Sequence, residues 1–223
     1  MTRVVIAGGH GKIALSLERL LSQRGDSVAG FIRNPDHAPD LSAVGAEALV
    51  TDLENASVDD VAAHLGGADA VVFAAGAGPG SGAARKETVD RDAAILLADA
   101  AETAKVARYV MISSIGADAE APDDVGDPVF VAYLRAKGAA DDNVRARNAL
   151  SSTIVRPGHL TNDPGTGRVM IADDTGHGSI PREDVAAVLL AVLDTPGTAG
   201  QTFEVISGDT PIAEAVATRG HRG

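Results

Sequence analysis

Short apolar runs alternate with amphipathic segments along the whole chain, and no other feature of the sequence limits the fold as strongly. Parallel strands joined by crossover helices produce this pattern, because buried strands are apolar on both faces whereas each helix has one apolar face. The sequence therefore predicts an α/β fold with a doubly wound parallel sheet. The expected strands are residues 3–7, 28–33, 47–53, 70–75, 109–112 and 152–156, and the expected helices are residues 12–24, 58–65, 88–103 and 129–148.

The residues after the sixth expected strand are too few to form a second domain. They contain an apolar run at 169–172, a helical pattern at 182–193, a strand pattern at 201–206 and a helical turn after Pro211. We therefore expect a single Rossmann-type domain over residues 1–223, in which residues 157–223 contribute a small cap on the substrate side.

Composition excludes several classes of function. The net charge of −12 disfavours nucleic acid as a partner, and the absence of cysteine excludes disulfides and thiolate metal sites. The histidines show no metal-ligand spacing, so we expect no metal.

No apolar run is long enough to span a membrane and no export signal precedes the first strand, so we expect a cytoplasmic protein. A small-molecule substrate fits the low aromatic content of 3%, and the outer helices of this fold are compatible with a homodimer.

A glycine-rich turn joins the first expected strand to the first expected helix. Glycines let the backbone approach a diphosphate closely, and the N-terminus of the following helix offers free amides and the positive end of its dipole. The turn therefore predicts a dinucleotide site, with a ligand-free turn as the alternative. His10 and Lys12 either contact phosphate oxygens or lie in solvent. The expected cofactor residues of this turn are Gly8, Gly9, His10, Gly11, Lys12 and Ile13.

Arg33 ends the second expected strand, where NAD-binding folds usually carry an acidic residue for the ribose 2′-hydroxyl. A carboxylate would repel a 2′-phosphate, whereas a guanidinium binds it through paired hydrogen bonds. The sequence therefore favours NADP (NADPH) as the cofactor over NAD. The alternative is that Arg33 is a solvent-exposed residue at a strand end.

Further cofactor contacts are expected at the carboxyl ends of other strands, because doubly wound sheets bind ligands at that edge. The placement of Asp52 and Leu53 beside the adenine rests on analogy with the fold. The expected contacts are Asp52 and Leu53 after the third strand, Ala75 and Gly76 after the fourth, and Pro157 after the sixth.

Tyr133 and Lys137 lie four residues apart in an expected helix, so they share one helical face. A free phenol has a pKa of about 10, and a nearby positive charge favours the phenolate, which can exchange a proton with a carbonyl or alcohol. Ser114 follows Ser113 at the end of the fifth strand, where a hydroxyl can orient a substrate oxygen. The alternative is an ordinary surface pair and a strand-end turn.

These motifs together resemble those of short-chain dehydrogenases/reductases, in particular atypical members of the NAD(P)H-binding, NmrA-like and epimerase-like type. The resemblance implies that Ser114 polarises the substrate oxygen, that Tyr133 transfers the proton, and that Lys137 holds the nicotinamide ribose and assists Tyr133. Asp90 stands where standard members have an active-site Asn. The motifs are the glycine turn, Phe31-Ile32-Arg33, Met111-Ile112-Ser113-Ser114, Tyr133-Leu134-Arg135-Ala136-Lys137, Val155-Arg156-Pro157-Gly158 and Ser207-Gly208-Asp209-Thr210-Pro211.

The sequence is compatible with three functions. The first is an NADP(H)-dependent oxidoreductase that acts on a small carbonyl or hydroxyl compound, as the combination of Ser, Tyr and Lys suggests. The second is a non-catalytic NADP(H)-binding regulator that senses redox state. The third, an epimerase or dehydratase that recycles the hydride internally, requires a larger substrate pocket and is the least favoured.

Overall fold

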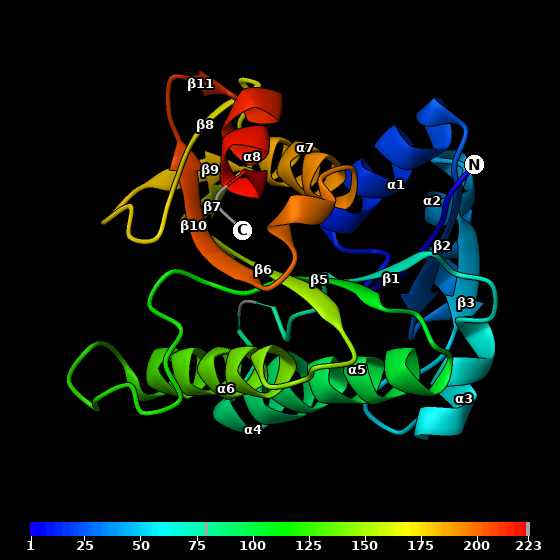
Figure 1. Cartoon of the computed structure of the whole chain (residues 1–223). Coiled ribbons are helices and arrows are strands. Elements are labelled where there is room, and N and C mark those ends of the chain that lie inside the picture. Colours follow the sequence, from blue (N-terminus) through cyan, green and yellow to red (C-terminus); the bar gives the residue numbers. More distant parts are fainter. Residues whose placement is uncertain (79, 222–223) are drawn as a thin grey trace.

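A mainly parallel sheet runs through the centre of the molecule, and helices cover both of its faces (Figure 1). The structure is a computed structural model that describes residues 1–78 and 80–221. Over these residues the central sheet has nine strands. They are β1 (Arg3–Ala7), β2 (Ser27–Ile32), β3 (Glu47–Val50), β4 (Ala70–Phe73), β5 (Arg108–Ile112), β6 (Ser151–Pro157), β8 (Arg168–Ala172), β10 (Gln201–Ser207) and β11 (Thr210–Pro211).

The strand order identifies the topology. It reads β11-β8-β10-β6-β5-β4-β1-β2-β3, with β1 to β6 and β10 parallel and with β8 antiparallel to both β10 and β11. The six N-terminal strands thus have the order of the doubly wound dinucleotide-binding fold. The predicted fold class is confirmed. The strand order reverses between β1 and β4, and this reversal creates the crevice in which such sheets bind ligands.

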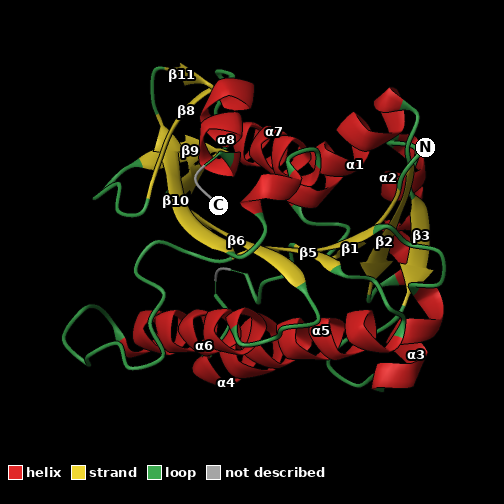
Figure 2. Cartoon of the chain, viewed as in Figure 1, coloured by secondary structure: helices red, strands yellow, loops and turns green. Residues whose placement is uncertain are grey.

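Helices α1, α7 and α8 cover one face of the sheet, and α3, α5 and α6 cover the other (Figure 2). Alternate strand residues point to opposite faces. Val4 and Ile6 therefore join the core beneath α1 and α7, whereas Val5 and Ala7 join the core beneath α5. The helices are α1 (Lys12–Arg24), α2 (Ala38–Ala43), α3 (Val58–His64), α4 (Ala83–Arg85), α5 (Ala93–Thr103), α6 (Pro128–Arg145), α7 (Arg182–Leu193) and α8 (Ile212–Gly220).

Residues after Pro157 extend the main sheet through β10, β8 and β11. They also form β7 (His159–Thr161) and β9 (Ser179–Pro181), which pair in parallel beside the main sheet. The sequence does not predict these short strands, because three residues are too few to show a strand pattern. In the described part of the chain, no helix combines the length and apolar character needed to cross a membrane.

The expected helix over residues 88–103 begins earlier and is not regular. It starts as α4, continues as a π-helical segment over Lys86–Asp92 and becomes regular in α5. The wider π-helical turn carries Lys86 and Asp90 and brings both to the crevice, in line with the frequent occurrence of π-helical turns at functional sites. Residue spacing does not reveal such a turn. The third strand also ends at Val50 instead of residue 53, so Asp52 and Leu53 lie in the turn beyond it.

Candidate active site

The turn after β1 can receive a diphosphate. Gly8 has a φ of +83°, and a Cβ at this position would lie 2.6 Å from the Cα of Ala75. The Gly11 amide donates to the Gly8 carbonyl at 2.8 Å, which closes the turn. Gly11 is the N-cap residue of α1, and no side chain among the described residues caps the first turn of this helix. Its amides therefore remain available to an anion.

Other residues of the turn have different surroundings. The Gly9 amide donates to the Phe31 carbonyl at 2.9 Å, and a Cβ on Gly9 would lie 2.8 Å from the Cα of Gly30. Gly9 therefore brings the turn close to β2 and does not line the adjoining pocket. Lys12 donates to Oδ1 of Asn162 at 3.1 Å, so its ammonium is directed to the segment after β7.

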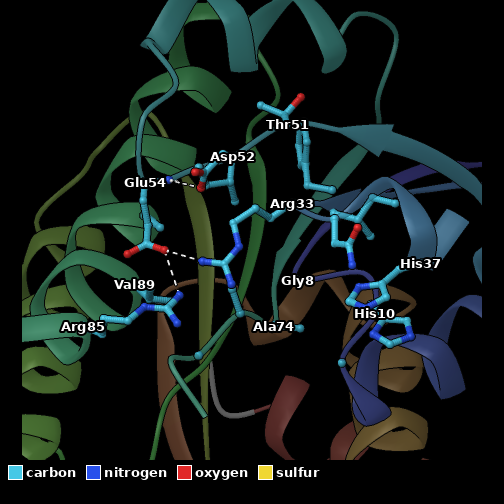
Figure 3. A pocket seen from close by; sticks show the side chains of 18 residues that line it. Gly8, His10, Arg33, His37, Thr51, Asp52, Glu54, Ala74, Arg85 and Val89 are labelled. Carbon is cyan, nitrogen blue, oxygen red and sulfur yellow. Dashed lines mark hydrogen bonds and ion pairs between the residues drawn. The ribbon is translucent and has the colours of Figure 1, made fainter. Parts of the chain in front are cut away.

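Within the described residues, three neighbouring pockets follow the carboxyl edge of the sheet. The first, here named the β2 pocket, has a volume of about 350 Å³ and lies between the glycine turn and the ends of β2 and β3 (Figure 3). The His10 and His37 rings stack at its side with centroids 3.6 Å apart, and His10 also bonds Asp40 at 2.7 Å. Its lining contains Gly8, His10, Gly11, Arg33, Asp52, Leu53, Ala75 and Gly76 from the expected cofactor set.

Glu54 forms ion pairs with two arginines in the β2 pocket. Its Oε2 accepts from Arg33 at 3.0 Å and from Arg85 at 2.8 Å, and its Oε1 accepts from Thr88 at 2.7 Å. Figure 3 shows both guanidinium groups directed at this carboxylate. Burial acts to raise the pKa of Glu54, but the hydrogen bonds from Thr88 and Arg85 outweigh it and hold the pKa below its usual range. Two arginines thus converge beyond the end of β2, and both already have an anionic partner.

The second pocket, here named the central pocket, has a volume of about 480 Å³ and shares Ala74, Ala75 and Gly76 with the β2 pocket. Lys137 lies at its base, where it donates to the Ile112 carbonyl at 3.2 Å and pairs with Oδ1 of Asp90 at 3.3 Å. The side chains of Lys137 and Asp90 are 5% and 1% exposed. Tyr133, Ile13 and Ser113 also line this pocket.

The sequence predicts that Lys137 assists Tyr133, but in the structure its ion-pair partner is Asp90. Its charge is compensated by Asp90, whose other oxygen accepts from the Ala77 amide at 3.2 Å. A second lysine lies over Tyr133: Lys86 Nζ is 5.3 Å from the centre of the ring and donates to the Gly78 carbonyl. The phenol thus has a cation over its face in addition to the lysine one helical turn away.

The third pocket, here named the outer pocket, has a volume of about 780 Å³ and shares Ser113, Tyr133 and Phe130 with the central pocket. Ser114 lines it and donates to the Ile115 carbonyl at 3.1 Å. Pro157 also lines this pocket and not the β2 pocket, so its position differs from the expected cofactor contact. Tyr133 thus lies at the boundary between the central and outer pockets.

A family model described as NAD(P)H-binding matches residues 8–196, which include the glycine turn, the Tyr133 helix and the whole of α7. The chain belongs to this NAD(P)H-binding family. The resemblance to atypical short-chain dehydrogenases/reductases is confirmed, and the glycine turn has its expected family context.

Relatives of this NAD(P)H-binding protein match nearly its whole length. A Bacillus subtilis protein named "Uncharacterized sugar epimerase YhfK" is 37% identical over 216 residues, which cover 96% of this chain and 98% of the relative. An epimerase/dehydratase-like protein of Bacillus halodurans has a solved structure with a TM-score of 0.89 and 38% identity, covering 98% of this chain and 100% of that chain. The oxidoreductase ylbE of Lactococcus lactis has a TM-score of 0.84 and 27% identity, covering 97% and 96%.

Most of the site residues expected from the sequence meet along one crevice of this NAD(P)H-binding protein. Gly9 and Lys12 are the exceptions, since they line none of these three pockets. Arg85, Lys86 and Arg182 also line these pockets, and no sequence pattern predicts them. Arg85 and Lys86 precede the expected helix, and Arg182 begins a helix without a recognisable motif. Among residues 1–78 and 80–221, no group of three or more His, Asp or Glu side chains could hold a metal ion.

Proposed function

We propose that this protein is an NADP(H)-dependent oxidoreductase that reduces a carbonyl compound or oxidises the corresponding alcohol. The observation that supports this most strongly is the location of Tyr133, which lines both the central and the outer pocket. The central pocket continues into the β2 pocket and its glycine turn. A dinucleotide bound on that turn would therefore extend toward Tyr133 and leave the outer pocket for a substrate.

When bound, the reduced cofactor supplies a hydride to the carbonyl carbon. The Tyr133 hydroxyl makes no hydrogen bond to any described residue, so it can donate its proton to the carbonyl oxygen. Ser114 lines the outer pocket together with Tyr133, so its hydroxyl would hydrogen-bond the same oxygen, and the proton and hydride together produce the alcohol. Asp90 and Lys137 form the buried base of the site and hold the helix that carries Tyr133.

NADP(H) is the proposed cofactor because the β2 pocket supplies guanidinium groups at the place where NAD-binding folds usually have a carboxylate. Arg33 follows β2 directly, and Arg85 reaches the same point from α4. A 2′-phosphate would compete with Glu54 for both groups, whereas a 2′-hydroxyl would not.

The experiment measures NADPH oxidation with a panel of quinones, aldehydes and ketones, using the intact protein and Tyr133→Phe. Loss of the phenolic proton should reduce kcat by about 10²- to 10⁴-fold while the Kd of NADPH stays unchanged. Tyr109→Phe is the matched control, because the Tyr109 hydroxyl is buried and donates to the Ala94 carbonyl away from the pockets. Its kcat should equal that of the intact protein.

Equal rates for Tyr133→Phe and the intact protein would exclude Tyr133 from the mechanism. NADPH binding without oxidation of the cofactor by any compound would favour the regulator. Isomerisation of a sugar without net change in the cofactor would favour the epimerase. The side chains of Ala121, Pro122, Val125 and Leu134 make part of the outer pocket apolar, which fits a less polar substrate than a sugar.

A further inference from the structure

One side of the outer pocket is apolar and unusually exposed. Val125 and Phe130 line it and are 46% and 44% exposed, and Val129 lines the adjoining central pocket. The Phe130 ring stacks with Tyr133 at a centroid distance of 6.2 Å and an interplanar angle of 28°. Adjacent exposed apolar groups indicate a binding surface, and here they surround the proposed proton donor. A flat apolar ligand would cover them.

Arg182 lies elsewhere in the lining of the same pocket and has no anionic partner among the described residues. Its Nη1 donates to the Leu160 carbonyl at 3.2 Å and to Oδ1 of Asn162 at 2.9 Å, and both acceptors are neutral. Over residues 1–78 and 80–221, no carboxylate lies within ion-pair distance of this guanidinium, and its Nη2 and Nε atoms make no hydrogen bond. The positive charge and a large part of its donor capacity therefore remain available.

The position of Arg182 connects this charge to the reaction. Arg182 lines both the central and the outer pocket, as do Tyr133 and Phe130. His159 and His177 add imidazole groups to the outer pocket, from the start of β7 and from the residues before β9. A molecule that contacts Arg182 and covers Phe130 would therefore lie against Tyr133.

We propose that Arg182 determines substrate specificity by binding a carboxylate on a flat, apolar substrate whose ring system lies against Phe130. This inference rests on the proposed reductase function for the nature of the reacting group. A guanidinium binds a carboxylate through two parallel hydrogen bonds, and the partly apolar surroundings strengthen the attraction. The apolar part of the substrate would pack against Val125 and Phe130.

The cofactor diphosphate is the competing anion for Arg182. Asn162 accepts from both Arg182 and Lys12, and Lys12 begins α1. However, Arg182 does not line the β2 pocket, whereas it lines both the central and the outer pocket. The structure therefore favours the substrate, and the experiment distinguishes the two anions.

The test compares two probes of the same shape, 2-naphthoate and the neutral 2-naphthamide, by calorimetry on the NADP⁺-saturated protein and on the protein without cofactor. The intact protein should bind the carboxylate roughly tenfold more tightly than the amide. Arg182→Met keeps an apolar side chain of similar length and should abolish this preference while amide binding is unchanged. Arg19→Met, which removes an exposed arginine of α1, is the control and should retain the preference.

The proposal is overturned if the intact protein binds neither probe or binds both equally well. It is also overturned if the Arg182→Met variant still prefers the carboxylate. Weaker NADP⁺ binding in Arg182→Met with an unchanged carboxylate preference would assign the arginine to the diphosphate. Failure of the proposed function is seen separately, as absence of NADP⁺ binding by the intact protein. The preference for 2-naphthoate over 2-naphthamide is also measured on the protein without cofactor, so it can be determined whether or not NADP⁺ binds.

Discussion

The β2 pocket and the outer pocket both contain arginine, but in the described part of the chain the arginine charges are paired with a carboxylate only in the β2 pocket. In the β2 pocket, Arg33 and Arg85 share the carboxylate of Glu54. In the outer pocket, Arg182 is bound to a carbonyl and an amide oxygen, which leave its charge uncompensated. An anion that enters the β2 pocket must replace an existing partner, whereas an anion in the outer pocket gains one. Affinity at the first pocket therefore depends on an exchange, and affinity at the second depends on direct attraction.

Two buried carboxylates, Glu18 and Asp141, also differ in whether their charge has a partner. Below the glycine turn, Glu18 is fully buried next to Gly9 and Gly30, and neither of its oxygens has a described hydrogen-bond partner. Near the outer pocket, Asp141 is equally buried but accepts from Arg156 at 2.8 Å. Burial raises the pKa of both carboxyls, to about 8 for Glu18, while Arg156 opposes the effect at Asp141.

The largest expected effect concerns Glu18. Because its pKa in the folded protein is about 8 and its ordinary value is 4.5, the folded state binds the extra proton between these values. The stability contribution is therefore present below pH 4.5 and is lost as the pH rises toward and through 8. The loss is about 1.4 kcal/mol per pH unit, on the order of 5 kcal/mol in total. Glu18→Gln should remove this component, as measured by urea unfolding across that range.

Glu120→Gln provides the control for Glu18, because Glu120 lies on an exposed loop. Its free energy of unfolding should follow the pH dependence of the intact protein. Curves for Glu18→Gln and the intact protein that run parallel from pH 4.5 to 8 would show that Glu18 is ionised in the folded state, and the contrast with Asp141 would disappear.

The next largest effect concerns the buried ion pair between Asp90 and Lys137 in the central pocket. Asp90→Ala leaves the Lys137 ammonium buried and without its carboxylate, so the free energy of unfolding should fall by about 3 kcal/mol. The double variant Asp90→Ala/Lys137→Met removes the stranded charge and should regain much of this loss. Chemical denaturation of the single and double variants measures both values. A double variant less stable than Asp90→Ala would show that Lys137 stabilises the protein through its bond to the Ile112 carbonyl instead.

The smallest effect tests the exchange at the β2 pocket. Arg33→Ala should weaken NADPH binding by about tenfold and leave NADH binding nearly unchanged, because NADH lacks the 2′-phosphate. Glu54→Gln should tighten NADPH binding by about threefold, because the arginines no longer have a competing carboxylate. Fluorescence titration with both nucleotides measures these changes. Equal loss of both nucleotides in Arg33→Ala, or weaker NADPH binding in Glu54→Gln, would contradict the exchange.

Local sequence determined the nucleotide-binding half of the crevice. Gly8 and Gly11 stand between an apolar strand and an amphipathic helix, and this order is enough to form the turn, because strand, turn and helix are contiguous in the chain. Arg33 could be placed for the same reason, since it directly follows the strand after the first helix. Spacing also put Tyr133 and Lys137 on one helical face, but it left open which partner the lysine would find.

Tertiary structure decided those partners and built the outer pocket. Asp90 reaches Lys137 through a π-helical turn that residue spacing does not reveal, and Glu54 joins Arg33 across 21 residues. Arg182 and Phe130 come from segments 52 residues apart that line the same hollow once the chain is folded. Side-chain partners are chosen by the packing of whole elements, which depends on contacts distant in the sequence. The amino-acid sequence therefore determined by itself the sheet and the phosphate turn, and only the folded molecule determined which charges are paired and which remain available for a ligand.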